Sequence, residues 1–322
     1  MKTTHTTIRA LLFSALALAL SALQPFSPSA FCSDAPRPNI ELGLQAYTFR
    51  NLTLAETLDC AVAMKIKNIQ IFQNQRLSPQ NNEKTNHNMS DAAKAEMRAL
   101  FKARGLNLTS YGVVIGKDEA EWRQIFAFAK EMGLRDIATE PKPEDMPLVD
   151  KLSRETGVNV TLHNHPAPNR FADPATSLAA VAPYGKNIGL CADTGHWARG
   201  GFDPVATLRR AQGRILSVHF KDLSELGVKT AHDVPWGTGV SHAAEQVLEL
   251  RRQGFNGIAY MEYEYKLPQA QLFAEASASA DWFLRAIAAS DDDLQAGRIL
   301  CNAPKPAPVP AQGNGGGKRK KK

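Results

Sequence analysis

Short apolar runs alternate with longer amphipathic segments between Ile40 and Ile287. The short runs contain few polar positions, which is typical of strands buried on both faces of a parallel sheet. Eight such strands are predicted, at residues 41–47, 68–72, 106–114, 136–140, 158–163, 188–196, 215–220 and 257–263.

The segments between the runs carry apolar residues at helical spacing. Thr53 and Glu56 have the spacing of a capping box, and Leu54 and Leu58 follow on one helix face. Further helices are predicted at residues 91–104, 119–132, 146–156, 204–212, 241–252 and 269–287, with a short one ending near residue 181. Eight strands alternating with eight helices predict an α/β protein with a single (β/α)8 TIM barrel over residues 40–287.

Both ends of the chain differ in character from this region. Residues 1–30 have the pattern of a secretory signal peptide, with Lys2 and Arg9 ahead of an apolar run at residues 10–23. Residues 290–322 change to Pro/Ala and Gly runs and end in five basic residues, a composition that predicts a disordered tail. We therefore expect an exported, periplasmic protein whose barrel is flanked by two non-globular segments.

The charge of the chain is concentrated in that tail. The formal net charge is +6, and Lys318–Lys322 supplies five of these charges, so +1 is left for the other residues. A near-neutral barrel argues against nucleic acid as its partner, whereas the tail could make weak contact with an anionic surface. The four cysteines form no CxxC motif, which argues against a zinc cluster or a disulfide scaffold.

Acidic and histidine side chains follow the last five predicted strands. They are Glu140, His163, His165, Asp193, His196, His219 and Glu262, together with Lys221. The carboxyl ends of all strands in a parallel barrel meet at one rim, where active sites lie. Carboxylates and imidazoles without thiolates suit Mn²⁺ best, with Co²⁺, Mg²⁺ or Zn²⁺ as alternatives. The sequence therefore predicts a divalent metal site that polarises a carbonyl and stabilises an enediolate.

Three motifs on the last three strands resemble the xylose isomerase-like TIM-barrel superfamily. They are Cys191–His196 (Cys-Ala-Asp-Thr-Gly-His), Ser217–Asp222 (Ser-Val-His-Phe-Lys-Asp) and Tyr260–Glu264 (Tyr-Met-Glu-Tyr-Glu). The resemblance covers about residues 40–287 and is closest to the sugar phosphate isomerase/epimerase family, in its inosose dehydratase-like branch. It implies a metal held by a Glu, an Asp, a His and a Glu.

The resemblance assigns three of these four ligands directly, to Asp193, His219 and Glu262. Inosose dehydratase-like sequences place the first ligand on the fourth strand, which is Glu140 here. Ketose 3-epimerase-like sequences place it on the fifth strand, where this chain has His163. We predict Glu140, because a third carboxylate suits a hard cation.

The remaining polar residues receive roles in catalysis and binding. His165, or alternatively His163, is predicted to be the general base, since an imidazole titrates near neutral pH. Lys221 is predicted to act on a substrate oxygen or to pair with an acid. His196 and Glu264 are predicted to contact substrate, with Glu264 as an alternative ligand. Trp236, in the polar loop 223–240, is either a platform for a sugar ring or part of the loop packing.

Two reactions fit these residues. One is isomerisation or epimerisation of a keto-sugar, and the other is β-elimination from a 3-keto-glycoside or an inosose by a lyase. A non-catalytic sugar-binding protein is a third, weaker alternative. The endonucleases of the superfamily need further histidines on the second and third strands, and residues 68–72 and 106–114 contain none. Export favours a free sugar or a glycoside over a sugar phosphate.

Overall fold

The computed structural model describes residues 38–303 and shows a closed barrel of eight parallel strands in chain order. The strands are β1 (Ile40–Gln45), β2 (Asn68–Ile71), β3 (Asn107–Tyr111), β4 (Asp136–Thr139), β5 (Asn159–His163), β6 (Ile188–Asp193), β7 (Ile215–Phe220) and β8 (Gly257–Met261). Pairing of β1 with β8, with Leu42 opposite Ala259, closes the ring. The predicted TIM barrel is confirmed.

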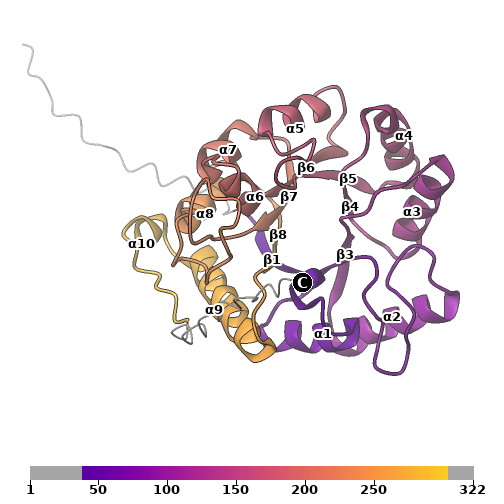
Figure 1. Ribbon diagram of the computed structural model, residues 1–322, viewed down its shortest axis with the longest axis horizontal. Coiled ribbons are helices and arrows are strands. Elements are labelled where there is room, and N and C mark those ends of the chain that lie inside the picture. The colour runs from indigo at the N-terminus through magenta and orange to yellow at the C-terminus, as the bar shows by residue number, and fades with distance from the viewer. Residues whose placement is uncertain (1–37, 304–322) are drawn as a thin grey trace, which may run out of the picture. The chain divides into compact units, whose positions relative to one another are not determined.

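The helices surround the ring of strands (Figure 1). They are α1 (Leu54–Ala63), α2 (Asp91–Arg104), α3 (Glu119–Glu131), α4 (Met146–Thr156), α5 (Pro174–Val181), α6 (Thr194–Arg199), α7 (Pro204–Arg210), α8 (Ala243–Arg252), α9 (Gln269–Ala288) and α10 (Asp291–Gln295), with 3-10 turns η1 (Ala46–Phe49) and η2 (Pro143–Asp145). Their apolar faces pack on the outside of the strands in one continuous core. None of the described helices is long and apolar enough to cross a membrane.

Local capping signals begin and end these helices as the sequence predicts. Thr53 and Glu56 form the reciprocal capping box of α1. Ser90 accepts a hydrogen bond from the Ala93 amide at the start of α2, and Gly105 ends that helix with a φ of 62°. Glycine adopts this left-handed conformation without the steric cost of a Cβ atom.

The structure differs from the predicted elements in two places that matter for the site and the tail. The sixth strand ends at Asp193, and the residues after it form helix α6 instead of continuing the strand. Residues 291–295, which the sequence assigned to the tail, form α10, whose Leu294 is buried. The predicted signal peptide and residues 304–322 of the predicted tail lie outside the described residues.

The loop 223–240 is anchored by Asp222. This buried carboxylate accepts hydrogen bonds from the backbone amides of Leu223, Gly237, Gly239 and Ser241. A Cβ atom on Gly239 would come within 2.4 Å of the Asp222 carboxylate, so only glycine allows this close approach. A loop that is polar and long in sequence thus has a defined conformation.

Trp236 lies inside this loop and is 1% exposed. Its ring packs against Phe220 and Phe283, with ring centroids 4.7 Å and 5.3 Å away. A side chain enclosed by aromatic neighbours cannot stack on a sugar, so the prediction of Trp236 as a substrate-binding residue is corrected to loop packing.

Candidate metal centre

Asp193 ends β6 and also caps the helix that follows it. Its Oδ1 accepts a hydrogen bond of 2.7 Å from the His196 amide at the start of α6. The Asn164 side chain accepts a hydrogen bond from the Asp193 N–H through Oδ1 and donates one to the Asp193 carbonyl through Nδ2. These bonds fix the carboxylate and leave Oδ2 facing the interior of the barrel rim.

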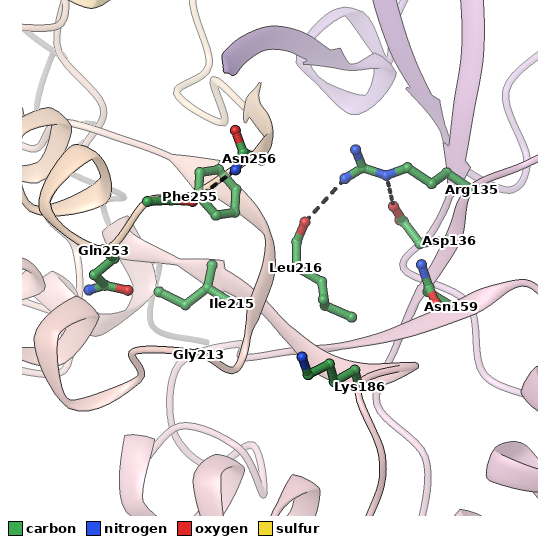
Figure 2. A pocket seen from close by; sticks show the side chains of 11 residues that line it. Arg135, Asp136, Asn159, Lys186, Gly213, Ile215, Leu216, Gln253, Phe255 and Asn256 are labelled. Atoms are coloured by element: carbon green, nitrogen blue, oxygen red, sulfur yellow. Dashed lines mark hydrogen bonds and ion pairs between the residues drawn. The ribbon is translucent and has the colours of Figure 1, made fainter. Parts of the chain in front are cut away.

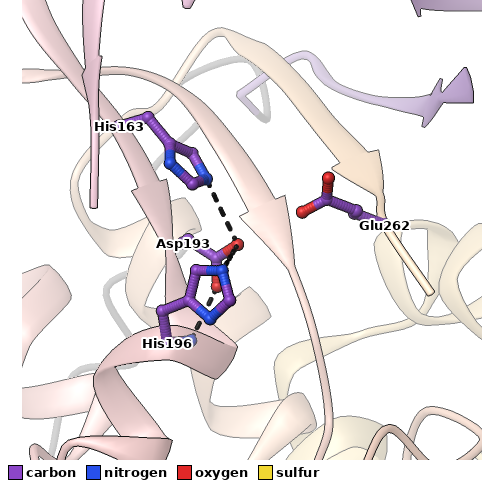
Figure 3. Close-up of side chains that lie close together, drawn as sticks. All are labelled: His163, Asp193, His196 and Glu262. Carbon is purple, nitrogen blue, oxygen red and sulfur yellow. Dashed lines mark hydrogen bonds and ion pairs between the residues drawn. The ribbon is translucent and has the colours of Figure 1, made fainter. Parts of the chain in front are cut away.

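Four charged or titratable side chains converge on Asp193 Oδ2. His163 Nε2 lies 3.5 Å away, His219 Nδ1 3.6 Å, His196 Nε2 3.7 Å and Lys221 Nζ 2.8 Å. Glu262 completes the group, with its Oε2 3.1 Å from His219 Nδ1. Figure 3 shows His163 and Glu262 directed toward Asp193 from their own strands. The predicted convergence at the carboxyl rim is therefore present.

The buried atoms at this point fit a divalent cation. Within residues 38–303, His163 Nε2, Asp193 Oδ2 and His196 Nε2 are buried without a hydrogen-bond partner, although Asp193 Oδ2 forms the ion pair with Lys221. Buried polar atoms are costly unless paired. One donor atom each from His163, Asp193, His196 and Glu262 lies within 4.8 Å of the others. A cation in their midst would remove this cost.

Arg199 determines whether His196 can bind a metal ion. Its Nη1 lies 3.0 Å from His196 Nδ1, and a guanidinium group can only donate. His196 Nδ1 is therefore the acceptor, and the ring hydrogen is on Nε2, where it blocks coordination. Burial lowers the pKa of His196 to about 3, against the charge of Asp193, so the ring is neutral at pH 7. With His196 as a hydrogen-bond donor, His163, Asp193 and Glu262 remain as possible ligands from this group. His219 lies beside them, with its Nδ1 3.6 Å from Asp193 Oδ2 and 3.1 Å from Glu262 Oε2.

Glu140 lies behind this set, at the end of β4. Its Oε1 is 3.0 Å from His163 Nδ1 and 2.5 Å from His165 Nδ1, and its Oε2 accepts from Asn169. Burial raises the pKa of Glu140, but the hydrogen bonds and charges of the two histidines outweigh it and lower the pKa, so Glu140 is a carboxylate. Direct ligation by Glu140 stays a prediction. Glu140, His163 and His165 bring one ligand atom each within 4.8 Å of one another, and the contact with His163 Nδ1 also fits the alternative, in which His163 is the ligand and Glu140 orients it.

The same contact with Glu140 prepares His165 to accept a proton. A carboxylate can only accept hydrogen bonds, so the ring hydrogen of neutral His165 is on Nδ1. Its Nε2 lone pair is therefore available. The side chain is 45% exposed and its ring lies 5.2 Å from that of His196, at the mouth of the site.

Lys221 is a buried ammonium group. Its Nζ lies 2.8 Å from Asp193, 2.9 Å from Glu262 and 2.8 Å from Glu264. Burial lowers the pKa of Lys221, but the three carboxylates outweigh it and hold the pKa well above its usual range. Lys221 is therefore a donor and not a base. Its positive charge offsets one of these three carboxylates.

Arg199 and Asp233 belong to the site, although the sequence did not single them out. Arg199 contacts Glu264 Oε2 at 2.8 Å and Asp233 Oδ2 at 3.2 Å, in addition to His196. Arg199 follows His196 by three residues, which is the spacing of one helix face. The signal was hidden because residues 194–196 were assigned to the end of the sixth strand. Asp233 comes from the loop 223–240, and nothing in the sequence places it beside Arg199.

A cavity of about 610 Å³ opens at the other end of the barrel. It is lined by residues that begin strands, including Asp136, Asn159 and Ile215, and by Arg135, which lies between Asp136 and the Leu216 carbonyl (Figure 2). None of the predicted site residues lines it. Active sites of TIM barrels lie at the carboxyl ends of the strands, so this cavity is separate from the candidate site.

Comparisons with known proteins agree with the fold. An uncharacterised protein from Parabacteroides distasonis is 32% identical, with a TM-score of 0.62 over 76% of this chain and 98% of that one. The IolI protein with a bound zinc atom (16% identity, TM-score 0.61, 77% and 98% coverage) has the same fold. So has a D-allulose 3-epimerase from Methylomonas sp. (14% identity, TM-score 0.58, 78% and 99% coverage).

No functionally curated protein matches the chain significantly. The family model described as xylose isomerase-like TIM barrel matches residues 58–286, which is most of the described region and contains the whole candidate metal centre. The chain therefore belongs to the xylose isomerase-like TIM barrel family.

Proposed function

We propose that this protein is a divalent-metal-dependent isomerase or epimerase that moves a proton next to the carbonyl of a keto-sugar. The observation that carries the proposal is the cluster of buried imidazole and carboxylate atoms around Asp193 Oδ2, in which His163 Nε2 has no hydrogen-bond partner, beside an oriented and partly exposed His165. The zinc-bound IolI structure and the D-allulose 3-epimerase support it by analogy of fold.

The metal would be held by His163, Asp193, His219 and Glu262. Two imidazoles and two carboxylates suit Mn²⁺, Co²⁺ or Zn²⁺ better than Mg²⁺, which prefers oxygen ligands. When bound, such a cation withdraws electrons from a carbonyl and so makes the neighbouring C–H bond more acidic. The protein's own share is to hold the four side chains in place around the cation.

His165 is the proposed base. Glu140 holds its Nδ1 hydrogen, which leaves Nε2 to accept a proton from substrate carbon. The Nε2–H group of His196 is a donor beside the same centre and can hydrogen-bond a substrate oxygen that gains negative charge. Lys221 adds a positive charge there, while its three N–H groups face Asp193, Glu262 and Glu264. Proton abstraction and charge stabilisation are thus assigned to different residues.

β-Elimination from a 3-keto-glycoside or inosose is the second candidate. Epimerisation by two bases needs a second proton-transfer group on the other side of the sugar. Glu264 is the acid at hand, but its contacts to Lys221 and Arg199 hold it as a carboxylate and occupy it. His165 as a single free base, with the N–H group of His196 as a donor beside it, is the observation that supports a lyase as the second candidate.

A substrate screen tests both candidates. Purified protein loaded with Mn²⁺ is assayed against free keto-sugars, inososes and 3-keto-glycosides in D₂O. Deuterium at the carbon next to the carbonyl of an isomer or epimer supports the first candidate, and release of an aglycone or water supports the second. No turnover of any of these classes, with a full equivalent of metal bound, would argue for a non-catalytic binding protein.

A further inference from the structure

Two buried glutamines connect the candidate metal centre to the backbone of the barrel. Gln45 ends β1 and Gln70 lies in β2, and they are 1% and 0% exposed. Gln45 Nε2 lies 2.6 Å from Gln70 Oε1. The same Gln70 oxygen lies 2.6 Å from Nε2 of His219. Neither glutamine has a role in the chemistry proposed above.

The orientation of the Gln45 amide is determined by two backbone groups. Its Oε1 accepts a hydrogen bond from the Tyr47 N–H at 3.1 Å, and its Nε2 donates to the Gly112 carbonyl at 2.9 Å. A backbone N–H can only donate and a carbonyl can only accept. Turning the Gln45 amide over would place donor against donor and acceptor against acceptor. Gln45 therefore presents an N–H group to Gln70.

The orientation of Gln70 follows from that of Gln45. The Gln70 atom that faces the Gln45 N–H has to be the oxygen. The opposite end agrees, because Gln70 Nε2 donates to Ser110 Oγ at 2.8 Å and Ser110 then donates to the Asp136 carboxylate at 2.5 Å. With Gln70 reversed, the Ser110 hydroxyl would have to serve two acceptors with one hydrogen.

The hydrogen on His219 is thereby placed as well. Since Gln70 Oε1 is an acceptor, His219 Nε2 has to carry a hydrogen. The other ring nitrogen, Nδ1, faces Glu262 Oε2 at 3.1 Å and Asp193 Oδ2 at 3.6 Å. A histidine ligand binds a metal through its unprotonated nitrogen, and the partner of its other nitrogen sets the tautomer.

We propose that Gln45 and Gln70 are positioning residues that hold the hydrogen of His219 on Nε2 and so present its Nδ1 to the divalent cation. The inference rests on the proposed metal function and adds the tautomer, the ligating atom and the two residues that determine them. The chain of hydrogen bonds begins at backbone groups of Tyr47 and Gly112, so the ligand is oriented by the barrel itself.

Nuclear magnetic resonance of ¹⁵N-histidine-labelled protein tests the tautomer directly, with Zn²⁺ as the diamagnetic probe. The His219 signals are assigned by their absence in His219→Asn. We expect a protonated Nε2 and a zinc-shifted Nδ1 in the wild type. Zinc bound through Nε2, or a His219 ring without a hydrogen on Nε2, would overturn the proposal. This measurement needs no glutamine variant to fold.

Zinc affinity measured by competition with a chelator tests the role of Gln70. Gln70→Met should weaken zinc binding by about 10–100-fold, the usual effect of removing the partner of a ligating histidine. Gln75→Met is the matched control, because Gln75 is also buried and its amide donates to the Leu52 carbonyl and the Thr57 hydroxyl, away from the site. Equal affinities of the two variants, both shown to be folded by circular dichroism, would refute the role.

The two proposals fail in distinguishable ways. If the wild type bound no metal, the proposed function would be wrong, yet the Nε2–H signal of His219 in the metal-free protein, recorded at a pH where the ring carries a single hydrogen, would still test the glutamines. If this signal is present in the wild type and in Gln75→Met but lost in Gln70→Met, the result supports the positioning role of the glutamines. If the signal is absent from the wild type, the result contradicts that role.

Discussion

The Asp193 carboxylate illustrates how much a single residue does at this rim. One oxygen caps α6 and the other faces three imidazoles and an ammonium group. Substitution by asparagine keeps the capping oxygen but replaces the charge, so its effect on metal binding can be separated from its effect on folding.

We expect Asp193→Asn and His219→Ala to lose most of the bound metal while staying folded, because rim residues contribute little to the core. Metal content by inductively coupled plasma mass spectrometry and the melting temperature are the measurements. Asp203→Asn is the control, since Asp203 also caps a helix, α7, but lies outside the site. Full metal occupancy in both site variants would rule the assignment out.

His165 supplies the second residue-scale prediction. His165→Ala should lower kcat by about 10²–10⁴, the usual contribution of a general base, while metal stays bound. Steady-state kinetics on a confirmed substrate is the measurement, and His242→Asn, a substitution of an exposed histidine with φ of 57° that asparagine tolerates, is the control. Wild-type rates in His165→Ala would move the search for the base to His163 or Glu264.

The pH dependence of metal binding follows from His163. In the metal-free protein burial lowers its pKa, but the carboxylates of Asp193 and Glu140, 3.5 Å and 3.0 Å from its two ring nitrogens, outweigh this and raise it to about 9. The unfolded residue titrates near about 6.5. The protonated ring therefore stabilises the metal-free fold below about pH 6.5, and this stabilisation is lost as the pH rises through about 9. A cation has to displace the same proton, so its affinity rises over this window.

We therefore expect opposite trends between about pH 6.5 and pH 8.5. The melting temperature of the metal-free protein should fall, and the increase in melting temperature caused by a fixed concentration of Mn²⁺ should grow. Glu140→Gln, which weakens the hold on the His163 proton, should move the second trend to lower pH. A metal-induced increase that does not change with pH would contradict the role of His163.

At the scale of elements, the loop 223–240 connects folding to the site. Asp222 holds the loop through four backbone amides, and the loop carries Asp233, which contacts Arg199. Arg199 in turn fixes the tautomer of His196. The order of the loop and the donor role of His196 are thus linked through three contacts.

Asp222→Ala should therefore disturb more than local stability. We expect the free energy of unfolding to fall by at least about 2 kcal/mol, since each buried donor left without a partner costs about 1–3 kcal/mol. Amide hydrogen exchange should increase across residues 223–240. Asp222→Asn keeps one acceptor oxygen, so its free energy of unfolding and its hydrogen exchange should lie between those of the wild type and the alanine variant. Unchanged exchange in the alanine variant would show that the loop is held by other contacts.

At the scale of the whole molecule, the N-terminal segment gives a prediction that does not depend on the barrel. The basic start and apolar run of residues 1–30 predict cleavage on export to the periplasm. Mass spectrometry of protein secreted by its native host should find a chain that begins near residue 31, and residues 38–303 should remain intact. An intact Met1 on the mature protein would disprove the prediction and would also remove the argument for an unphosphorylated substrate.

Much of this molecule follows from the sequence by itself. The alternation of apolar runs and amphipathic segments predicts eight strands and their helices, because a parallel sheet buries both faces and needs helical crossovers. The same topology brings the ends of the strands together. Asp193, His219 and Glu262 could therefore be placed at one rim without any knowledge of distances.

The tertiary structure decided what the atoms of that rim do. Glu140 and His163 were both possible ligands in the sequence, and the structure places Glu140 Oε1 3.0 Å from His163 Nδ1. Trp236 proved to be buried, and Arg199 proved to orient His196. Gln70 meets His219 across 149 residues of sequence. Such contacts depend on strand register and side-chain rotamers, which the hydrophobic pattern leaves open, because it specifies which face a residue occupies but not which atom it touches.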